Sequence, residues 1–373
     1  MNYNYSFWMG ERYTTLENKP LHKISMPGTH NSAASKMIFE KYQFTHKFFK
    51  LLQRFSGIFV IQDMIRLLSI NQSMSIHEQL MLGIRYFDLR LTYNPVTEKF
   101  FFSHSFLNQT FEEVMNDFTR YFKDPRSKKE VIVIEIVLDY ANRNNHNKEK
   151  FKQLMNKMTD FNSLVFFGNS PFSTYGDIVK SGKNIVIFSN KRVIDSPYTF
   201  DINKIQTSKW FEHPQTANDV LEAQITYVTE NYNPSKFMQI KAQSSPNIPE
   251  SIKYIVHLSI LYVLLFLILF PFLIVLTITM YRSYRTSFSY TLSDHHLYSS
   301  MVSILSLIAL FSISLVVLTL LFPSTKENAH ELQKRVIPEV KSRMCHGKFH
   351  VSSIATDWPT NSFVKEVVEM NLL

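Results

Sequence analysis

The residues best suited to acid–base chemistry begin with His30, in the segment SMPGTHNS at Ser25–Ser32. Proline fixes φ and glycine accepts strained backbone conformations, so Met26-Pro27-Gly28 predicts a tight bend that ends a strand over Leu21–Ser25. The bend would place His30 and Asn31 on a loop at the carboxyl end of that strand. A single histidine is more often a core or surface residue than a catalytic one, so the interpretation depends on the rest of the chain.

Two further segments supply partners for this histidine. In GIRYFDLRL at Gly83–Leu91 the side chains alternate with the period of two that is typical of a strand, which puts Asp88 and Arg90 on one face. His104 ends a following apolar strand, within FFSHS. Two histidines, a carboxylate and an arginine at strand ends predict a general acid–base site that acts on a phosphate ester.

These segments, found in this order, resemble the X domain of phosphatidylinositol-specific phospholipase C (PI-PLC). The likeness is closer to short X-domain-only proteins and bacterial enzymes than to the large multidomain animal enzymes. It extends through KKEVIVIEI at Lys128–Ile136, GKNIVIFSN at Gly182–Asn190 and SSIATDWPTNSFVKEVVEMN at Ser352–Asn371. It covers most of the chain apart from two long insertions, and it implies a phosphodiesterase of the phospholipase C type, with a membrane phospholipid as substrate.

The resemblance also implies roles for five residues. His30 would be the base that acts on the inositol 2-hydroxyl, and His104 the acid that protonates the diacylglycerol oxygen. Arg90 would bind the phosphate. Asp88 would orient His104, and Asp357 in the terminal IATDW strand would orient His30.

Two departures from the family pattern bear on the metal and on the substrate. Asn31 stands where metal-independent bacterial enzymes usually carry Asp, and calcium-dependent animal enzymes use Asn there as a ligand. However, Arg90 lies in a region where those animal enzymes carry an acidic pair, so we expect a metal-independent, cofactor-free enzyme with Asn31 as a substrate-binding residue. If calcium is used, Asn31 and Glu135 are the candidate ligands. Val137 stands where the bacterial pattern has a substrate-binding lysine, which leaves inositol selectivity open.

Composition is consistent with a large α/β domain. A barrel of about 250 residues fits within the 373-residue chain, and 45% of the residues are hydrophobic. Forty Lys and Arg against 31 Asp and Glu give a net charge of +9, which suits an anionic membrane surface or a nucleic acid. Nucleic-acid binding would rest on charge alone, so we expect none. The single Cys345 excludes an internal disulfide and a multi-cysteine zinc site.

Helical and strand patterns alternate from Ile76 onward. Helices are predicted over Ser75–Leu82, Thr110–Phe122 and Lys148–Met158, and strands over Glu130–Leu138, Asn184–Ser189 and Phe237–Gln243. Alternation of this kind predicts parallel strands joined by crossover helices. We therefore expect an α/β fold, an irregular parallel (β/α) TIM-type barrel with an inserted two-helix transmembrane hairpin.

The hairpin is predicted from two apolar runs. No formally charged residue lies between Lys253 and Arg282, and a second run extends from Met301 to Phe322. Each exceeds the ~20 residues needed to cross ~30 Å of hydrocarbon. The domains would then be a first barrel part (1–252), a transmembrane hairpin (253–323) and a second barrel part (324–373). The protein would be a two-span, multi-pass membrane protein, and the positive residues near the helix ends favour a cytoplasmic catalytic domain.

The first insertion has an amphipathic pattern over Phe44–Phe59, with a basic polar side. It predicts a helix that either packs on the barrel or lies on anionic lipid beside the site.

A different class of function stays open. The chain could be a catalytically inactive, membrane-tethered lipid-binding or scaffold module of the same fold. The presence of all five polar site residues favours an enzyme. A glycerophosphodiesterase-type barrel is disfavoured because the early acidic metal ligands are lacking. The sequence leaves the oligomeric state open.

Overall fold

The computed structural model describes residues 5–38, 70–104, 106–138, 145–168, 170–189, 199–208, 217–243 and 325–373, with isolated positions at 278, 303 and 306. Residues 1–245 and 324–373 belong to one compact unit. The predicted helix over Phe44–Phe59 lies outside the described residues.

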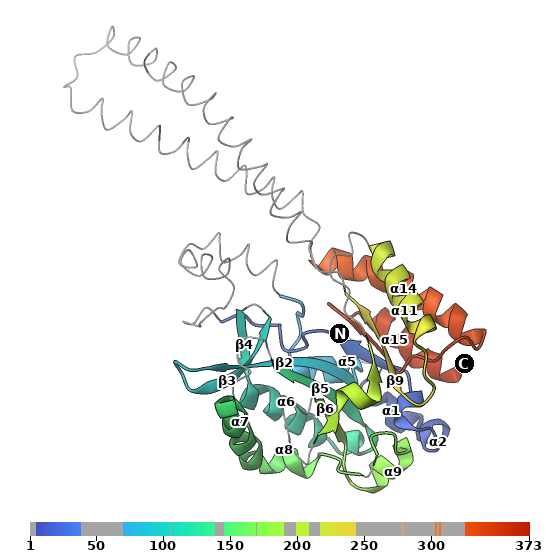
Figure 1. Ribbon diagram of the computed structural model, residues 1–373, viewed down its shortest axis with the longest axis horizontal. Coiled ribbons are helices and arrows are strands. Elements are labelled where there is room, and N and C mark those ends of the chain that lie inside the picture. The colour runs from blue at the N-terminus through green and yellow to red at the C-terminus, as the bar shows by residue number, and fades with distance from the viewer. Residues whose placement is uncertain are drawn as a thin grey trace, which may run out of the picture. The chain divides into compact units, whose positions relative to one another are not determined.

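A parallel sheet organises this unit (Figure 1). Its strand order is β7-β6-β5-β2-β1-β10-β9-β8, and every neighbouring pair on this path is parallel. The end strands β7 and β8 are joined in sequence by the single turn α10, so the chain itself links the two ends of the path. The strands are β1 (Met26–Thr29), β2 (Tyr86–Asn94), β5 (Ile132–Leu138), β6 (Ile185–Ser189), β7 (Phe200–Asp201), β8 (Gln206–Thr207), β9 (Phe237–Ala242) and β10 (Ser353–Thr356).

Helices cover the outside of the sheet. Figure 1 shows α11, α14 and α15 together beside β9, whereas α6 and α7 lie near β3 and α8 packs against these two helices. The α-helices are α1 (Trp8–Glu11), α2 (Tyr13–Leu16), α5 (Ile76–Leu82), α6 (Phe111–Phe122), α7 (Asn145–Lys157), α8 (Thr159–Ser163), α9 (Tyr175–Lys180), α10 (Ile202–Ile205), α11 (Ala217–Glu230), α14 (Thr325–Cys345) and α15 (Asn361–Glu369). The 3₁₀ turns are η1 (Leu21–Lys23), η2 (Pro125–Lys129) and η4 (Met370–Leu372). The predicted α/β alternation is confirmed, and the parallel sheet with its outer helices is a fold of the barrel type.

Local signals explain where the helices before the site begin and end. Ser75 and Glu78 form a capping box at the start of α5, and Gly83 closes the helix with φ 112°. A second capping box, between Thr110 and Glu113, starts α6. The chain therefore leaves α5 at a fixed point and enters β2 with its register set.

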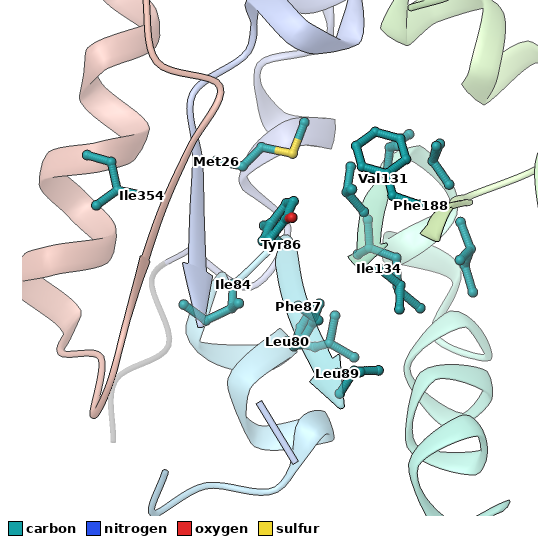
Figure 2. Close-up of a cluster of buried hydrophobic side chains, with 14 of the residues drawn as sticks. Met26, Leu80, Ile84, Tyr86, Phe87, Leu89, Val131, Ile134, Phe188 and Ile354 are labelled. Atoms are coloured by element: carbon teal, nitrogen blue, oxygen red, sulfur yellow. The ribbon is translucent and has the colours of Figure 1, made fainter. Parts of the chain in front are cut away.

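The apolar side chains of β2 and β5 point outward to these helices. Phe87 packs edge-on against Phe118 of α6, with ring centroids 5.1 Å apart. Figure 2 shows part of this buried cluster, with Phe87, Leu89, Ile134 and Leu80 labelled. Because side chains alternate along a strand, the opposite, inward face is left for the polar residues Asp88 and Arg90.

The prediction for the first strand is wrong in its position. Met26-Pro27-Gly28 was expected to be a bend, but these residues form β1 itself, and Leu21–Lys23 is a 3₁₀ turn. Gly28 serves close packing and not a turn, because a Cβ there would meet Ser353 Oγ at 3.0 Å and Tyr86 Cβ at 3.1 Å. His30 still follows the carboxyl end of the strand, as expected.

The strand that carries His104 runs antiparallel to its neighbour. The sequence had predicted parallel strands only. β3 (Lys99–His104) pairs with β2, with Leu91 opposite Phe102, and β4 (Phe106–Thr110) pairs with β3. A hairpin returns the chain within a few residues, whereas a parallel crossover needs a dozen or more. The return brings His104 back along β2 toward the level of Leu89 and Arg90.

The membrane prediction needs correction. Among the residues that the structure describes, no helix has the length and apolar character needed to cross a bilayer. Apart from the isolated positions 278, 303 and 306, the two runs predicted to span the membrane, within 253–323, lie outside the described residues. Spanning requires a continuous apolar helix, since the bilayer offers backbone groups no partners, and an uncharged run in the sequence is not sufficient evidence for one. We therefore withdraw the two-span, multi-pass assignment, the transmembrane hairpin and the cytoplasmic placement that depended on them.

A buried ion pair fixes the start of β2. Arg85 Nε donates to Glu130 Oε2 at 2.7 Å, both side chains have no exposed surface, and Arg85 Nη2 also donates to Ser6 O at 2.6 Å. Glu130 Oε1 accepts from the backbone N–H of Gly10 at 2.7 Å. The pair thus ties the N-terminal segment to the strand that leads into Asp88 and Arg90.

We expect Arg85→Met to lower the free energy of unfolding by about 3–5 kcal/mol, because it leaves a buried carboxylate without its cation. Denaturant unfolding of the purified protein measures this, and Arg85→Met with Glu130→Gln should recover part of the loss. Arg126→Met, which removes an exposed partner of Asp124, is the control and should change little. An equally small effect of Arg85→Met would contradict the anchoring role.

Candidate active site

His30 and Asp357 meet where β1 and β10 end side by side. His30 Nδ1 lies 3.0 Å from Asp357 Oδ1, and the side chains are 5% and 4% exposed. The adjacent strands explain the contact. Their last residues, Thr29 and Thr356, pair with each other, and His30 and Asp357 directly follow them. His30 N also donates to Thr356 O at 3.0 Å, which fixes the backbone at the histidine.

Arg90 contacts the other nitrogen of the same ring. Its Nη2 lies 2.9 Å from His30 Nε2 and 3.7 Å from Asp88 Oδ2, and its side chain is 35% exposed. A guanidinium has only donors, so Nε2 accepts from Arg90 and carries no proton. The proton of neutral His30 is then on Nδ1, where it is donated to Asp357. The two partners together favour one tautomer, with the proton on Nδ1 and an unprotonated Nε2 that accepts from Arg90.

The second histidine is close to the first. The ring centroids of His30 and His104 are 6.0 Å apart with an interplanar angle of 74°. The structure thus brings His30, Arg90 and His104 to the same end of the sheet. The ion pair that it shows for buried Asp88 is with Arg90, so the predicted orientation of His104 by Asp88 stays a prediction.

Asn31 lies beside this group in a left-handed backbone conformation, with φ 43°. Its Nδ2 donates to Asn71 Oδ1 at 3.3 Å, while its buried Oδ1 has no hydrogen-bond partner among the described residues. Next to Asn71, Gln72 donates from Nε2 to His30 O at 2.7 Å and to Thr356 O at 3.3 Å. The sequence pattern did not single out these two residues, because their partners are distant in the chain.

A second polar group lies on the inward faces of β2, β5 and β9. The Tyr86 hydroxyl donates to Glu135 Oε2, and Lys241 Nζ lies 4.0 Å from Glu135 Oε1. Lys241 was not predicted as a site residue. The alternation of Gln239, Lys241 and Gln243 within FMQIKAQ was the available signal, since it places all three on one face of a strand.

The loop after β10 is held from α14. Gln333 Nε2 donates to Asp357 O at 2.9 Å and to Trp358 O at 3.0 Å, and Trp358 has φ 47°. No sequence pattern pointed to Gln333, because its partners lie in another element. Within the described part of the chain no group of three His, Cys, Asp or Glu side chains is arranged to hold a metal ion.

Comparison with known proteins supports the sequence resemblance. Human PI-PLC X domain-containing protein 2 is 27% identical over 154 residues, 36% of this chain and 50% of that protein. The variant-surface-glycoprotein phospholipase C of Trypanosoma brucei brucei is 24% identical over 164 residues, 41% of this chain and 45% of that protein. The chain resembles the PI-PLC X-domain proteins. It spans about half the length of these curated relatives, and no family model matches it.

Solved PI-PLC structures share the fold. The enzyme from Listeria monocytogenes has a TM-score of 0.54 and 14% identity, with 95% of each chain covered. A double mutant of the Staphylococcus aureus enzyme has a TM-score of 0.53 and 12% identity, with 99% of each chain covered. At this identity the likeness establishes the PI-PLC-like fold.

The electrostatic environment of this site favours the neutral form of His30. Burial, followed by the charges of Arg90, His104 and Lys241, lowers the pKa of His30 well below its ordinary value of 6.5. Burial also raises the pKa of Asp357 well above its ordinary value, and Asp88 adds to the rise, whereas Asn71 and Arg90 oppose it. Both shifts have one main cause, the cost of a charge in a buried site.

A lowered pKa means that His30 loses its proton at a lower pH than a free histidine, so we expect a neutral ring at pH 6.5 and above. NMR titration of ¹⁵N-labelled histidines, with His30→Ala for assignment, measures this. Lys241→Met should move the pKa of His30 upward, because one of the cations that lower it is removed. Half-protonation of His30 at or above pH 6.5 would contradict the expected electrostatics.

Proposed function

We propose that the chain is a phosphoric diester hydrolase of the phospholipase C type, which cleaves a phosphoinositide-type phosphodiester by His/His acid–base catalysis. The observation that supports it best is the contact geometry of buried His30, whose Nδ1 lies 3.0 Å from Asp357 Oδ1 and whose Nε2 lies 2.9 Å from Arg90 Nη2. The resemblance to the PI-PLC X-domain proteins supports a membrane phospholipid as substrate.

The reaction we infer is an internal displacement. His30 Nε2 takes the proton of the hydroxyl next to the phosphate, and that oxygen attacks phosphorus to form a cyclic phosphodiester. The bond from phosphorus to the leaving alcohol breaks as His104 donates a proton to the departing oxygen. Arg90 turns from Nε2 to the phosphate oxygens and offsets the charge that grows on them.

Supporting residues hold this geometry. Asp357 accepts a hydrogen bond from the Nδ1–H of His30. It thereby stabilises the imidazolium that forms when Nε2 gains a proton. The buried Asn31 Oδ1, which has no hydrogen-bond partner in the described part of the chain, would accept from a substrate hydroxyl. Asp88 keeps Arg90 near His30 before substrate binds.

We propose that the reaction does not depend on calcium. Of the candidate ligands, Glu135 already accepts from Tyr86 and lies 4.0 Å from the ammonium of Lys241. Arg90 supplies a second positive charge beside Asn31 and His30. A divalent cation prefers several anionic oxygens and is repelled by fixed cations, so these residues do not fit a calcium site.

The wild-type protein should release a cyclic inositol phosphate from phosphatidylinositol. His30→Ala and His104→Ala should each reduce the rate by about 10²-fold or more, since each removes a general acid or base. Product release from mixed detergent micelles, followed by ³¹P NMR, measures this. His346→Ala, at an exposed histidine of the chain, is the matched control.

Full activity of both site variants would overturn the assignment. A folded wild type that binds the lipid without turnover would favour the inactive lipid-binding module instead.

Removal of calcium tests the metal proposal separately. Activity in excess chelator should stay within about twofold of the activity with added calcium, because Arg90 supplies the charge that a metal would otherwise provide. A loss of activity in chelator that calcium restores would refute this.

A further inference from the structure

A residue in the left-handed conformation directly follows each member of the His30–Asp357 pair. Among the residues that the structure describes, the non-glycine residues with a positive φ are Asn31 (43°), Glu98 (54°) and Trp358 (47°). Glu98 lies in the turn between β2 and β3. The other two come directly after His30 and Asp357. β1 and β10 therefore end in the same way, with the chain turning sharply just past the paired residue.

These turns need support from outside the two strands. A side chain larger than glycine crowds its own backbone at positive φ; asparagine tolerates this conformation better than other residues, and a bulky tryptophan rarely adopts it. Such a conformation persists only where surrounding contacts determine it, and it is found most often at functional sites. The contacts that hold the two turns are therefore candidates for a role in the site.

Gln72 holds the turn after His30. Its side chain has no exposed surface, and its Nε2 donates to His30 O at 2.7 Å and to Thr356 O at 3.3 Å. One amide group thus joins the ends of β1 and β10. The backbone of Gln72 is itself fixed, because its N–H donates to Ala34 O at 3.2 Å.

Gln333 holds the turn after Asp357 from a different element, α14. Its side chain is buried, and its Nε2 donates to Asp357 O at 2.9 Å and to Trp358 O at 3.0 Å. Its Oε1 accepts from Thr360 Oγ1 at 3.3 Å, so the nitrogen is the atom that faces the turn. Each glutamine donates to the carbonyl of the residue that precedes the left-handed position. The two glutamines therefore act on equivalent atoms of the two turns.

We propose that Gln72 and Gln333 are positioning residues, which hold the two turns so that His30 and Asp357 face each other. Both act through backbone carbonyls. Without either donor a carbonyl beside a left-handed residue loses its partner, the turn relaxes, and the hydrogen bond from His30 Nδ1 to Asp357 Oδ1 opens more often. The inference rests on the proposed function only for the role of His30 as a base, since the geometry belongs to the protein without substrate.

Exchange of the His30 Nδ1 proton with solvent measures this geometry without turnover, because the proton exchanges only when its hydrogen bond opens. NMR of the full chain with ¹⁵N-labelled histidines, with His30→Ala for assignment, follows the proton. Gln72→Met and Gln333→Met each keep the length of the side chain and remove the donor. Each should speed the exchange roughly tenfold, the change expected when the net contribution of one hydrogen bond is lost.

Steady-state kinetics provide a second readout. With phosphatidylinositol in mixed micelles, kcat of either glutamine variant should fall about tenfold and KM should stay within about twofold of wild type. A misplaced base slows the chemical step, whereas no contact to the substrate is removed.

Asn184 offers a matched control at the opposite end of the sheet, just before β6. It is also buried, and its Nδ2 donates to the backbone carbonyls of Lys128 at 3.1 Å and Glu130 at 2.7 Å. Asn184→Leu thus removes a buried carboxamide with the same kind of contacts. It should lower the free energy of unfolding but leave the exchange of the His30 proton and kcat unchanged.

The two glutamines lie in different parts of the chain, so each variant tests the inference if the other does not fold. Unchanged exchange and kcat, equal changes in Asn184→Leu, loss of folding in both glutamine variants, or a wild-type Nδ1 proton that exchanges as fast as that of a free histidine would each overturn it. Faster exchange in the variants of a protein that does not turn over phosphatidylinositol refutes the proposed function alone. Turnover by the wild type with unchanged exchange and kcat in the variants refutes the inference alone.

Discussion

The buried hydrogen bond between His30 and Asp357 is the constraint on which the site depends. The two residues are 327 positions apart in the sequence, and they meet because β1 and β10 are neighbours in the sheet. A charge on either ring or carboxylate is costly in this setting, so the neutral histidine with its proton on Nδ1 is the favoured form. The unprotonated Nε2 is thus a consequence of strand pairing and burial.

The polar interior also depends on the alternation of side chains along the strands. On β2, Phe87 and Leu89 pack outward, which leaves Asp88 and Arg90 facing inward. Gly28 has to be small because a Cβ there would meet Ser353 Oγ at 3.0 Å and Tyr86 Cβ at 3.1 Å. Packing of the apolar outer face and placement of the charged inner face are therefore determined together, and the Arg85–Glu130 pair fixes where the alternation starts.

Local signals made much of the fold predictable. The capping boxes of α5 and α6 fix helix starts from residues three positions apart, and period-two alternation identified β2. The position of β1 was not predictable in this way, because Pro and Gly favour turns unless close packing against Tyr86 requires a glycine in a strand. The antiparallel return of β3 depends on pairing with β2, which the apolar character of the strand does not reveal.

The candidate site likewise contains residues that the sequence predicted and residues that it did not. His30, Arg90, His104 and Asp357 were predicted as site residues because they lie in segments that resemble a family. Lys241, Asn71 and Gln333 were missed, since each acts on a partner in another element and only the register of the strands brings them together. The orientation of His104 by Asp88 stays a prediction, and the structure shows the Asp88 carboxylate 3.7 Å from Arg90.

Internal attack by a hydroxyl of the substrate is the central claim, and isotope incorporation tests it most directly. Cleavage of phosphatidylinositol in water enriched in ¹⁸O, with mass spectrometry of the first phosphorylated product, distinguishes the attacking oxygen. The account predicts a first product without solvent ¹⁸O, because the oxygen that displaces the alcohol belongs to the head group. One ¹⁸O atom in the first-formed product from the earliest time points would show direct attack by water and contradict it.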